Sequence, residues 1–269
     1  MIASSIMAIM VAALAGVAMA VRQSWDYSHA HGDANLHAQV ALARIARAVS
    51  EATTTENLPG VAVAVYQVGT EQFPDTLVVW NPAGAPQNAT GPPLVRECVF
   101  YCPDPVDPRR LVEITAPADN STISLTSDIT SPAGLAQVDA IKAAPTSQKV
   151  LLTPRLRVVR VTSDPSSARG CVRFVRRLRP SAAEWASYKA GTLTWANLSW
   201  PQTIYGSTTG LRQAWVRSEI QLVPGRDLSS ADPDAPVTAP DADELIRGSE
   251  RDLAVPFFGS ASVYYDMPK

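Results

Sequence analysis

The chain opens on a run, Met1 to Val21, in which no side chain is charged and only Ser4 and Ser5 are clearly polar. A helix of this length spans roughly 31 Å, which matches the hydrocarbon thickness of a bilayer. Because a helix that is apolar on every face must be buried in lipid or protein, the pattern predicts a single transmembrane helix over residues 1–21. The alternative is a cleavable signal peptide, with Ala18 and Ala20 forming its cleavage site. No basic residue precedes the run, which favours a retained anchor.

Beyond this run the pattern becomes amphipathic. Leu42, Ile45 and Val49 recur at helical spacing, and charged side chains lie off their stripe. We therefore expect the helix to continue over residues 22–56 and to pack its apolar face on a globular body, with Gly32 as the point at which it kinks. The threonine run at residues 53–55, with Pro59 and Gly60 beyond it, predicts the end of the helix.

The remaining residues, 57–269, read mostly as strands. Short runs rich in β-branched and aromatic residues are separated by Pro, Gly and Asn. These runs predict strands at 61–68, 75–80, 94–102, 110–116, 121–127, 193–200, 212–223 and 261–267. Residues 155–161 and 171–178 alternate apolar and basic positions, and we expect them to form a half-exposed antiparallel pair.

Two short helices and a loop complete the prediction. Helices are expected within residues 133–148 and over 181–189, where Ser181 and Glu184 form a capping box. Residues 224–250 are rich in Asp, Pro and Ala, which predicts a mobile surface loop. The fold class is therefore α+β, with a long N-terminal helix, membrane-spanning in its first half, packed on an antiparallel β-sheet domain.

The net charge and the cysteine content exclude only a few classes of function. A net charge of −2 gives no electrostatic case for nucleic acid. A basic stripe is better explained as an exposed sheet face or a subunit contact; its members are Arg155, Arg157, Arg160, Arg173, Arg176, Arg177 and Arg179.

The three cysteines do not form a disulfide framework or a metal-binding spacing. Cys98 and Cys102 are separated by about 13 Å if the chain between them is extended, which is too far for a bridge. Either a bridge from one of them to Cys171 or three free thiols fits the sequence.

Candidate catalytic and metal-binding residues are few. The histidines, His29, His31 and His37, all precede the β-rich region, so a Ser-His-Asp or Cys-His catalyst is not expected there. Weak calcium candidates cluster in the acidic loop at Asp232, Asp234, Asp241, Asp243 and Glu244, without the spacing of an EF-hand. A hydrolase that uses only Asp and Glu remains a remote alternative. We expect no cofactor and no enzymatic activity.

The N-terminal 52 residues resemble the helix of type IV pilin-like proteins, in particular the larger minor pseudopilins of type II secretion, of the J type. The uncharged run resembles the family's membrane segment. The second part resembles the family's phrase of a Leu, two Arg flanking an Ile, and a Glu-Ala pair, found here at Leu42, Arg44, Ile45, Arg47, Glu51 and Ala52. In that family a basic leader, a processing Gly and an early Glu precede the run. None of these is present, and we therefore expect Met1 to be an internal Met of a longer reading frame.

The resemblance implies that the helix is buried first in lipid and then among the helices of a filament. Small side chains allow close helix approach in both environments. The residues it implies for assembly are Ile6, Ile9, Leu14, Gly16, Val17, Leu42, Ile45 and Val49.

The expected function is a non-enzymatic minor pilin or pseudopilin subunit of a type II secretion or type IV pilus-like filament. Its expected partners are other pilin-like subunits, the inner membrane and the secretion or pilus assembly machinery. Its expected location is the inner membrane, crossed once, with the C-terminal domain in the periplasm. The alternative is an anchored or secreted extracytoplasmic binding domain.

Overall fold

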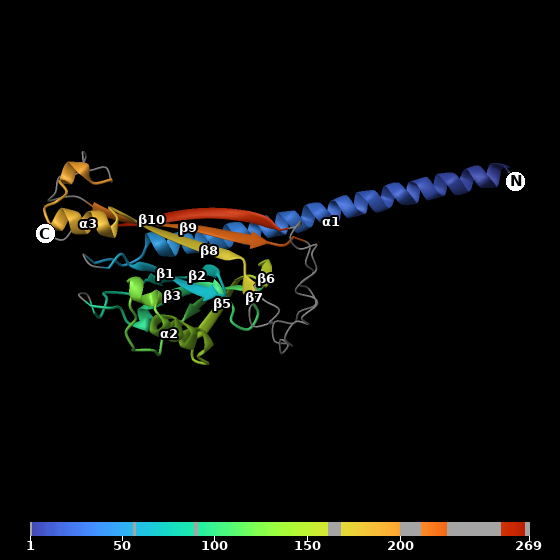
Figure 1. The fold of residues 1–269 in the computed structure, drawn as a ribbon. Coiled ribbons are helices and arrows are strands. Elements are labelled where there is room, and N and C mark those ends of the chain that lie inside the picture. Colours follow the sequence, from blue (N-terminus) through green and yellow to red (C-terminus); the bar gives the residue numbers. More distant parts are fainter. Residues whose placement is uncertain are drawn as a thin grey trace.

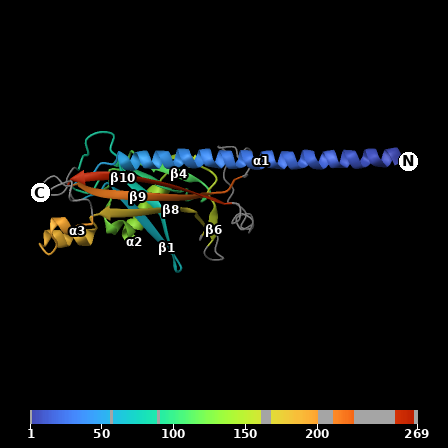
Figure 2. The ribbon, with the colours of Figure 1, turned by 90° about the horizontal axis from the view of Figure 1, so that it is seen from above.

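The computed structural model describes residues 2–55, 58–88, 91–160, 168–199, 211–224 and 254–266. One helix, α1 (Ile2–Ser50), runs from the N-terminal end into a body of strands and projects far beyond it (Figure 1). Seen from above, α1 is straight along its length (Figure 2). The backbone is helical at Gly32, where the sequence predicted a kink. A glycine without a proline or an inserted side chain leaves the backbone ladder intact, so no bend results.

The body contains two main antiparallel sheets. The larger sheet follows chain order, and its strands are β1 (Val61–Val68), β2 (Glu71–Trp80), β3 (Cys98–Pro103), β4 (Leu111–Thr115) and β5 (Gln148–Thr153). The smaller sheet has the order β10-β9-β8, and its strands are β8 (Val172–Arg179), β9 (Leu211–Leu222) and β10 (Val255–Asp266). A short ribbon joins β6 (Val158–Arg160) to β7 (Ala168–Gly170).

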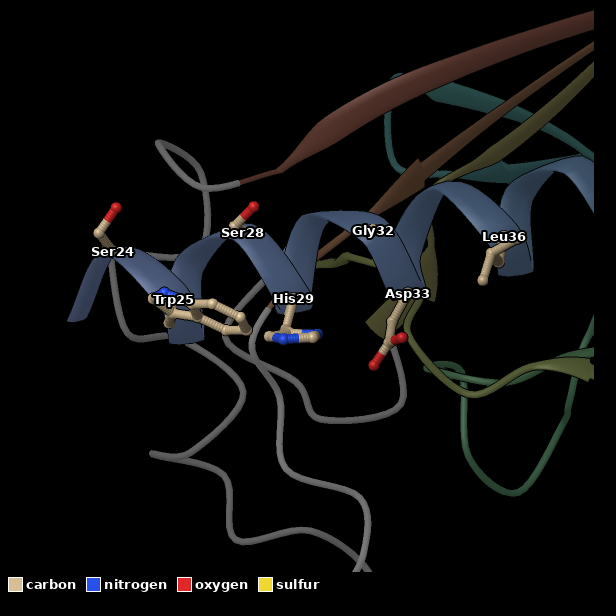
Figure 3. A pocket seen from close by; sticks show the side chains of 7 residues that line it. All are labelled: Ser24, Trp25, Ser28, His29, Gly32, Asp33 and Leu36. Atoms are coloured by element: carbon tan, nitrogen blue, oxygen red, sulfur yellow. The ribbon is translucent and has the colours of Figure 1, made fainter. Parts of the chain in front are cut away.

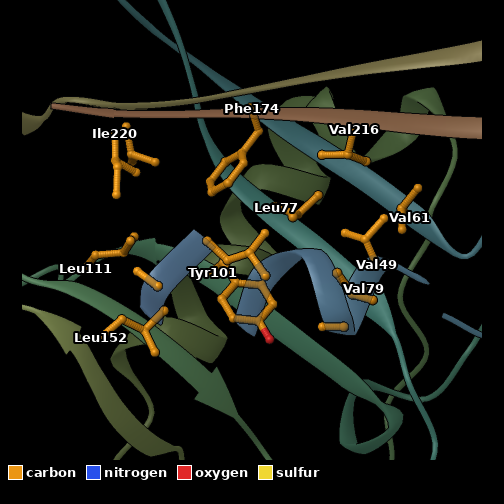
Figure 4. Close-up of a cluster of buried hydrophobic side chains, with 14 of the residues drawn as sticks. Val49, Val61, Leu77, Val79, Tyr101, Leu111, Leu152, Phe174, Val216 and Ile220 are labelled. Atoms are coloured by element: carbon orange, nitrogen blue, oxygen red, sulfur yellow. The ribbon is translucent and has the colours of Figure 1, made fainter. Parts of the chain in front are cut away.

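The main core lies between the two sheets and α1. Figure 4 shows some of its members, including Val49 of α1, Leu77 of β2 and Phe174 of β8. The opposite face of the larger sheet packs on a second cluster that includes Val138 and Ile141 of α2 (Pro132–Ala143). Because this sheet is covered on both faces, all residues of β2 from Asp75 to Trp80 are buried.

Helix α1 ends at Ser50, six residues before the predicted boundary. The Ser50 hydroxyl donates to the backbone oxygens of Ala46 and Arg47. Three residues later, the Thr53 N–H donates to the Trp80 oxygen at 2.8 Å, which ties the chain to β2. A Cβ at Gly60, whose φ is +70°, would lie 2.1 Å from the Thr53 oxygen, so this close approach requires glycine.

Several strand predictions are confirmed and others are wrong. Residues 121–127 contain one isolated bridge, from Thr122 to Leu94, in place of a strand. Residues 193–199 contain a 3-10 turn, η4 (Trp195–Asn197), because Trp195 and Leu198 pack in a local aromatic cluster with Trp185. That cluster also holds α3 (Ala182–Lys189), whose predicted capping box is present.

The predicted pair of residues 155–161 and 171–178 is also wrong. Their strands do not pair with one another; β6 pairs with β7, and β8 pairs with β9 over its whole length. Local pairing of β6 with β7 leaves β8 free to align with the longer β9. Strand β5, which begins where the helix of residues 133–148 was expected to end, was not predicted.

Two further short elements are 3-10 turns, η1 (Val95–Glu97) and η2 (Ser127–Thr130). The first replaces the beginning of the strand predicted at 94–102.

Candidate functional site

The residues that separate this chain from an ordinary β-rich body lie in α1, which has two contrasting halves. Residues 34–50 pack on the body, and we call them the docked half. Residues 2–33 form the projecting half, which extends for about 48 Å. The described side chains of residues 10–29 are all exposed, whereas Ala30 and His31, next to the body, are half-buried.

The docked half presents small side chains to the core. Its buried inner stripe consists of Ala34, Ala38, Ala41, Ile45, Ala48 and Val49. Spacings of three and four residues keep these positions on one face of the helix. Alanines let the backbone approach closely, and at Leu42 the helix meets Gly259 of β10, where a Cβ would lie only 3.1 Å from the leucine side chain.

Two ion pairs fix the docked half at its edges. The Arg44 guanidinium donates two hydrogen bonds to the carboxylate of Glu113 on β4, and the one from Nη2 to Oε1 is 2.7 Å long. This hydrogen-bonded pairing raises the pKa of the Arg44 guanidinium. At the junction with the projecting half, Arg155 lies 3.6 Å from Asp33. These two ion pairs, Arg44–Glu113 and Arg155–Asp33, hold the helix where it enters the body, and we call them the clamp.

A second apolar stripe runs along the side of α1 that faces away from the body. Trp25 and Ala34 are nine residues apart, which places them about 180° apart around the helix. Leu14 is 68% exposed and Leu36 is 61% exposed, although both are large apolar residues. We call the set the outer stripe; its members are Met7, Val11, Leu14, Val21, Trp25, Leu36 and Val40. A row of exposed large apolar side chains on one face is typical of an interaction surface.

The structure divides the assembly residues that the sequence suggested. Leu14, Gly16 and Val17 are exposed in the projecting half, with Leu14 on the outer stripe and Gly16 on the opposite side. The side chains of Ile6 and Ile9 lie outside the described part of the structure.

The other three residues face the body. Ile45 and Val49 are buried in the core, and Leu42 packs on Gly259. These three residues hold α1 on the body, and the outer stripe stays exposed. Sequence reasoning missed Leu36 and Val40, although their spacing of four with exposed polar neighbours was a usable signal.

Among the residues that the structure describes, no helix is long and apolar enough to cross a membrane. Within the same residues, no group of His, Cys, Asp and Glu is arranged to hold a metal ion. The calcium candidates Asp232, Asp234, Asp241, Asp243 and Glu244, like most of the loop 224–250, lie outside the described part.

Of the three histidines, His29 lines a surface hollow beside α1 (Figure 3). Its described lining, which includes Trp25, His29 and Asp33, comes entirely from α1. A single helix face is convex, so these residues alone do not enclose a ligand. The His29 ring lies 5.3 Å from the Trp25 ring, and the His31 ring lies 4.0 Å from the Tyr27 ring.

The predicted basic stripe does not form one surface. Arg176 points inward and donates to the backbone oxygens of Val61 and Leu125, while Arg173 and Arg177 are exposed on β8. Arg155 belongs to the clamp at Asp33. The stripe therefore divides into side chains that join elements of the body and side chains that are exposed on β8.

The three cysteines are free. Cys98 and Cys102 are buried on β3, and burial raises the pKa of Cys102 to about 12. A thiol with so high a pKa is a poor nucleophile at neutral pH, so these two residues pack in the core.

Comparison with models of protein families, with curated proteins and with solved structures finds no match to this chain.

Proposed function

We propose that the protein is a non-enzymatic, pilin-like structural subunit that joins a filament through α1. The observation that carries the proposal is one continuous helix whose docked half packs on the body and whose described side chains between residues 10 and 29 are all exposed. A bare apolar helix in water is costly, because each large exposed side chain forgoes about 1.5–3 kcal/mol of burial. The projecting half therefore needs a partner environment.

Two environments suit this half. Residues 2–21 carry no charge, which supports a place in lipid before assembly. From Met7 to Trp25 the outer stripe then offers other helices an apolar seam, and small residues such as Ala13, Gly16 and Ala20 permit close approach on the other side. Residues 25–33 carry aromatic and polar side chains, as protein segments at the boundary between membrane and water do.

In this proposal the protein crosses the inner membrane once and holds its body in the periplasm. Its partners are other pilin-like subunits and the secretion or pilus assembly machinery. The minor subunits of type II secretion filaments are the class that its N-terminal resemblance favours. The clamp formed by Arg44, Glu113, Asp33 and Arg155 keeps the body at a fixed position along the helix while the projecting half is transferred.

The proposal is tested by adding a pilin leader before Met1 and expressing the chain with a pilin-like assembly system. We expect cleavage of the leader by the prepilin peptidase and recovery of the mature chain in sheared filaments. A matched chain with the same leader and Leu36→Lys should be cleaved but absent from the filament fraction, because its charge lies on the outer stripe and outside the segment that the proposal places in lipid. Recovery of both chains in that fraction, or of neither, argues against assembly through this face.

A further inference from the structure

A cavity of about 200 Å³ lies in the body, beside α2. Its walls come from four places: Asp75 of β2, the turn between β3 and β4, α2, and β7. None of its described lining residues belongs to α1, so it is separate from the proposed assembly surface.

The floor of the cavity is a network of buried charges and hydroxyls. Lys142 donates to the Tyr66 hydroxyl at 3.0 Å and to the Thr76 hydroxyl at 2.8 Å. Each hydroxyl donates onward to a carboxylate, Tyr66 to Asp139 at 2.7 Å and Thr76 to Asp75 at 2.9 Å. Lys142 and Asp75 are only 6% and 2% exposed. Charges buried this deeply are costly unless every partner is supplied.

Two charged groups on the cavity wall, the Asp75 carboxylate and the Arg169 guanidinium, can each make further hydrogen bonds or ion pairs. Asp75 uses one carboxylate oxygen for Thr76, and its other oxygen has no partner among the described residues. Arg169 lies with its guanidinium 5.3 Å from the centre of the Tyr66 ring. Its Nε is buried, and within the described residues the group makes no hydrogen bond or ion pair.

The electrostatics of Asp75 agree with this geometry. Burial raises the pKa of its carboxyl, and the charge of Lys142, the Thr76 hydrogen bond and the charge of Arg169 oppose that rise in decreasing order. A carboxylate and a guanidinium thus line one cavity and influence each other, yet no ion pair joins them. A ligand that carries both a positive and a negative charge would give the carboxylate and the guanidinium each an ion-pair partner.

The walls are held in place before any ligand arrives. A Cβ at Gly170 would lie 2.3 Å from the Pro108 oxygen and 3.1 Å from the Pro103 side chain, so β7 sits directly against the turn. Three prolines line the turn, Pro103, Pro105 and Pro108, and restrict its backbone. A preformed cavity loses little entropy when it binds.

We propose that this cavity binds a small zwitterion of the α-amino acid class, with its ammonium at Asp75 and its carboxylate at Arg169. A simple anion would meet the carboxylates of Asp75 and Asp139, and a simple cation would meet Lys142 and Arg169. Since each water occupies about 30 Å³ of liquid, the volume holds about six heavy atoms, the size of a small amino acid. This binding site is independent of filament assembly.

The first test is calorimetric titration of the full chain in detergent micelles with glycine, L-alanine and L-serine. Acetate and methylammonium supply the two charges separately. We expect saturable binding of at least one amino acid at one per chain, and binding of each half-ligand weaker by roughly tenfold or more, because each makes only one charge-assisted contact. Absence of saturable binding overturns the proposal, and so does equal affinity for acetate or for methylammonium.

The second test uses variants of the wall. Arg169→Met and Asp75→Asn should each weaken amino-acid binding by roughly tenfold or more, whereas Arg177→Met, on the exposed face of β8, should not change it. Retention of affinity by both wall variants contradicts the assignment. Circular dichroism identifies a variant that has not folded, and the comparison of whole and half ligands on the unmodified chain does not depend on any variant.

Discussion

Both halves of α1 are rich in alanine, but their surroundings are opposite. The docked half buries four of its six alanines against the sheets and leaves Leu36 and Val40 outside. The projecting half buries none of the side chains described between residues 10 and 29. A high alanine content therefore does not decide which face of a helix is packed; the surface that the body presents to the helix does.

The comparison also separates two ways to hold a helix. On the body, small residues bring the backbone close and the Arg44–Glu113 pair fixes its position. Beyond the body, large residues on the outer stripe offer area without any fixed geometry. The first arrangement suits a permanent contact, and the second suits one formed after the helix has left another environment.

The largest effect is expected from a charge placed in the projecting half. Leu14→Lys should remove the chain from the membrane fraction or from its assemblies, since a lysine at the centre of a membrane helix costs about 3 kcal/mol. Sedimentation after alkaline extraction measures this loss. Gln23→Lys, on the other side of the helix and nearer its polar part, is the control and should sediment as the unmodified chain does.

A strong effect is expected where the docked half meets the sheets. Ala41 is fully buried, so Ala41→Leu should overpack the core and lower the free energy of unfolding by about 2 kcal/mol. Ala43→Leu adds the same atoms to an exposed position and should change it by less than about 0.5 kcal/mol. Urea denaturation compares the two, and equal midpoints would show that this face of α1 is not packed on the body.

A smaller effect is expected from the clamp. Arg44→Met leaves the buried Glu113 carboxylate without its cation and should cost about 1–2 kcal/mol, a figure reduced because Arg44 itself is half exposed. Arg47→Met breaks only the exposed pair with Glu51 and should cost about 0.5 kcal/mol or less. If denaturation ranks the two variants in the opposite order, the clamp does not hold the helix.

The smallest effect is expected at the boundary between the halves. A Cβ at Gly32 would meet no atom of another element within 4 Å, so Gly32→Ala should stabilise the helix locally by about 0.5–1 kcal/mol. Slower hydrogen exchange of the surrounding amides would report this, and Ala30→Gly should have the reverse effect. Faster exchange in Gly32→Ala would mean that the junction requires a bend.

Much of this fold follows from local pattern. The long helix, β1 and the capping box of α3 are all determined by periodicity or by residues a few positions apart. The errors arise where distant contacts decide: the end of α1 depends on a bond from Thr53 to Trp80, and the conformation near Trp195 depends on an aromatic cluster. Strand partners such as β8 with β9 also depend on residues far along the chain.

The candidate sites show the same limit. The uncharged run identifies α1 as the element of interest, but the face it leaves open depends on which residues the two sheets cover. Likewise nothing local links Asp75, Lys142 and Arg169, which come together only through the packing of β2, α2 and β7.

The central claim is that the outer stripe of α1 contacts another helix, and cysteine cross-linking in the membrane tests it most directly. In a Cys171→Ser background, Leu14→Cys labelled with benzophenone-maleimide should form photo-adducts whose partner, identified by mass spectrometry, is a subunit with an uncharged N-terminal helix. Gln23→Cys, on the opposite side, should remain largely uncross-linked. A monomer-only result for Leu14→Cys, or equal cross-linking at both positions, would contradict the claim.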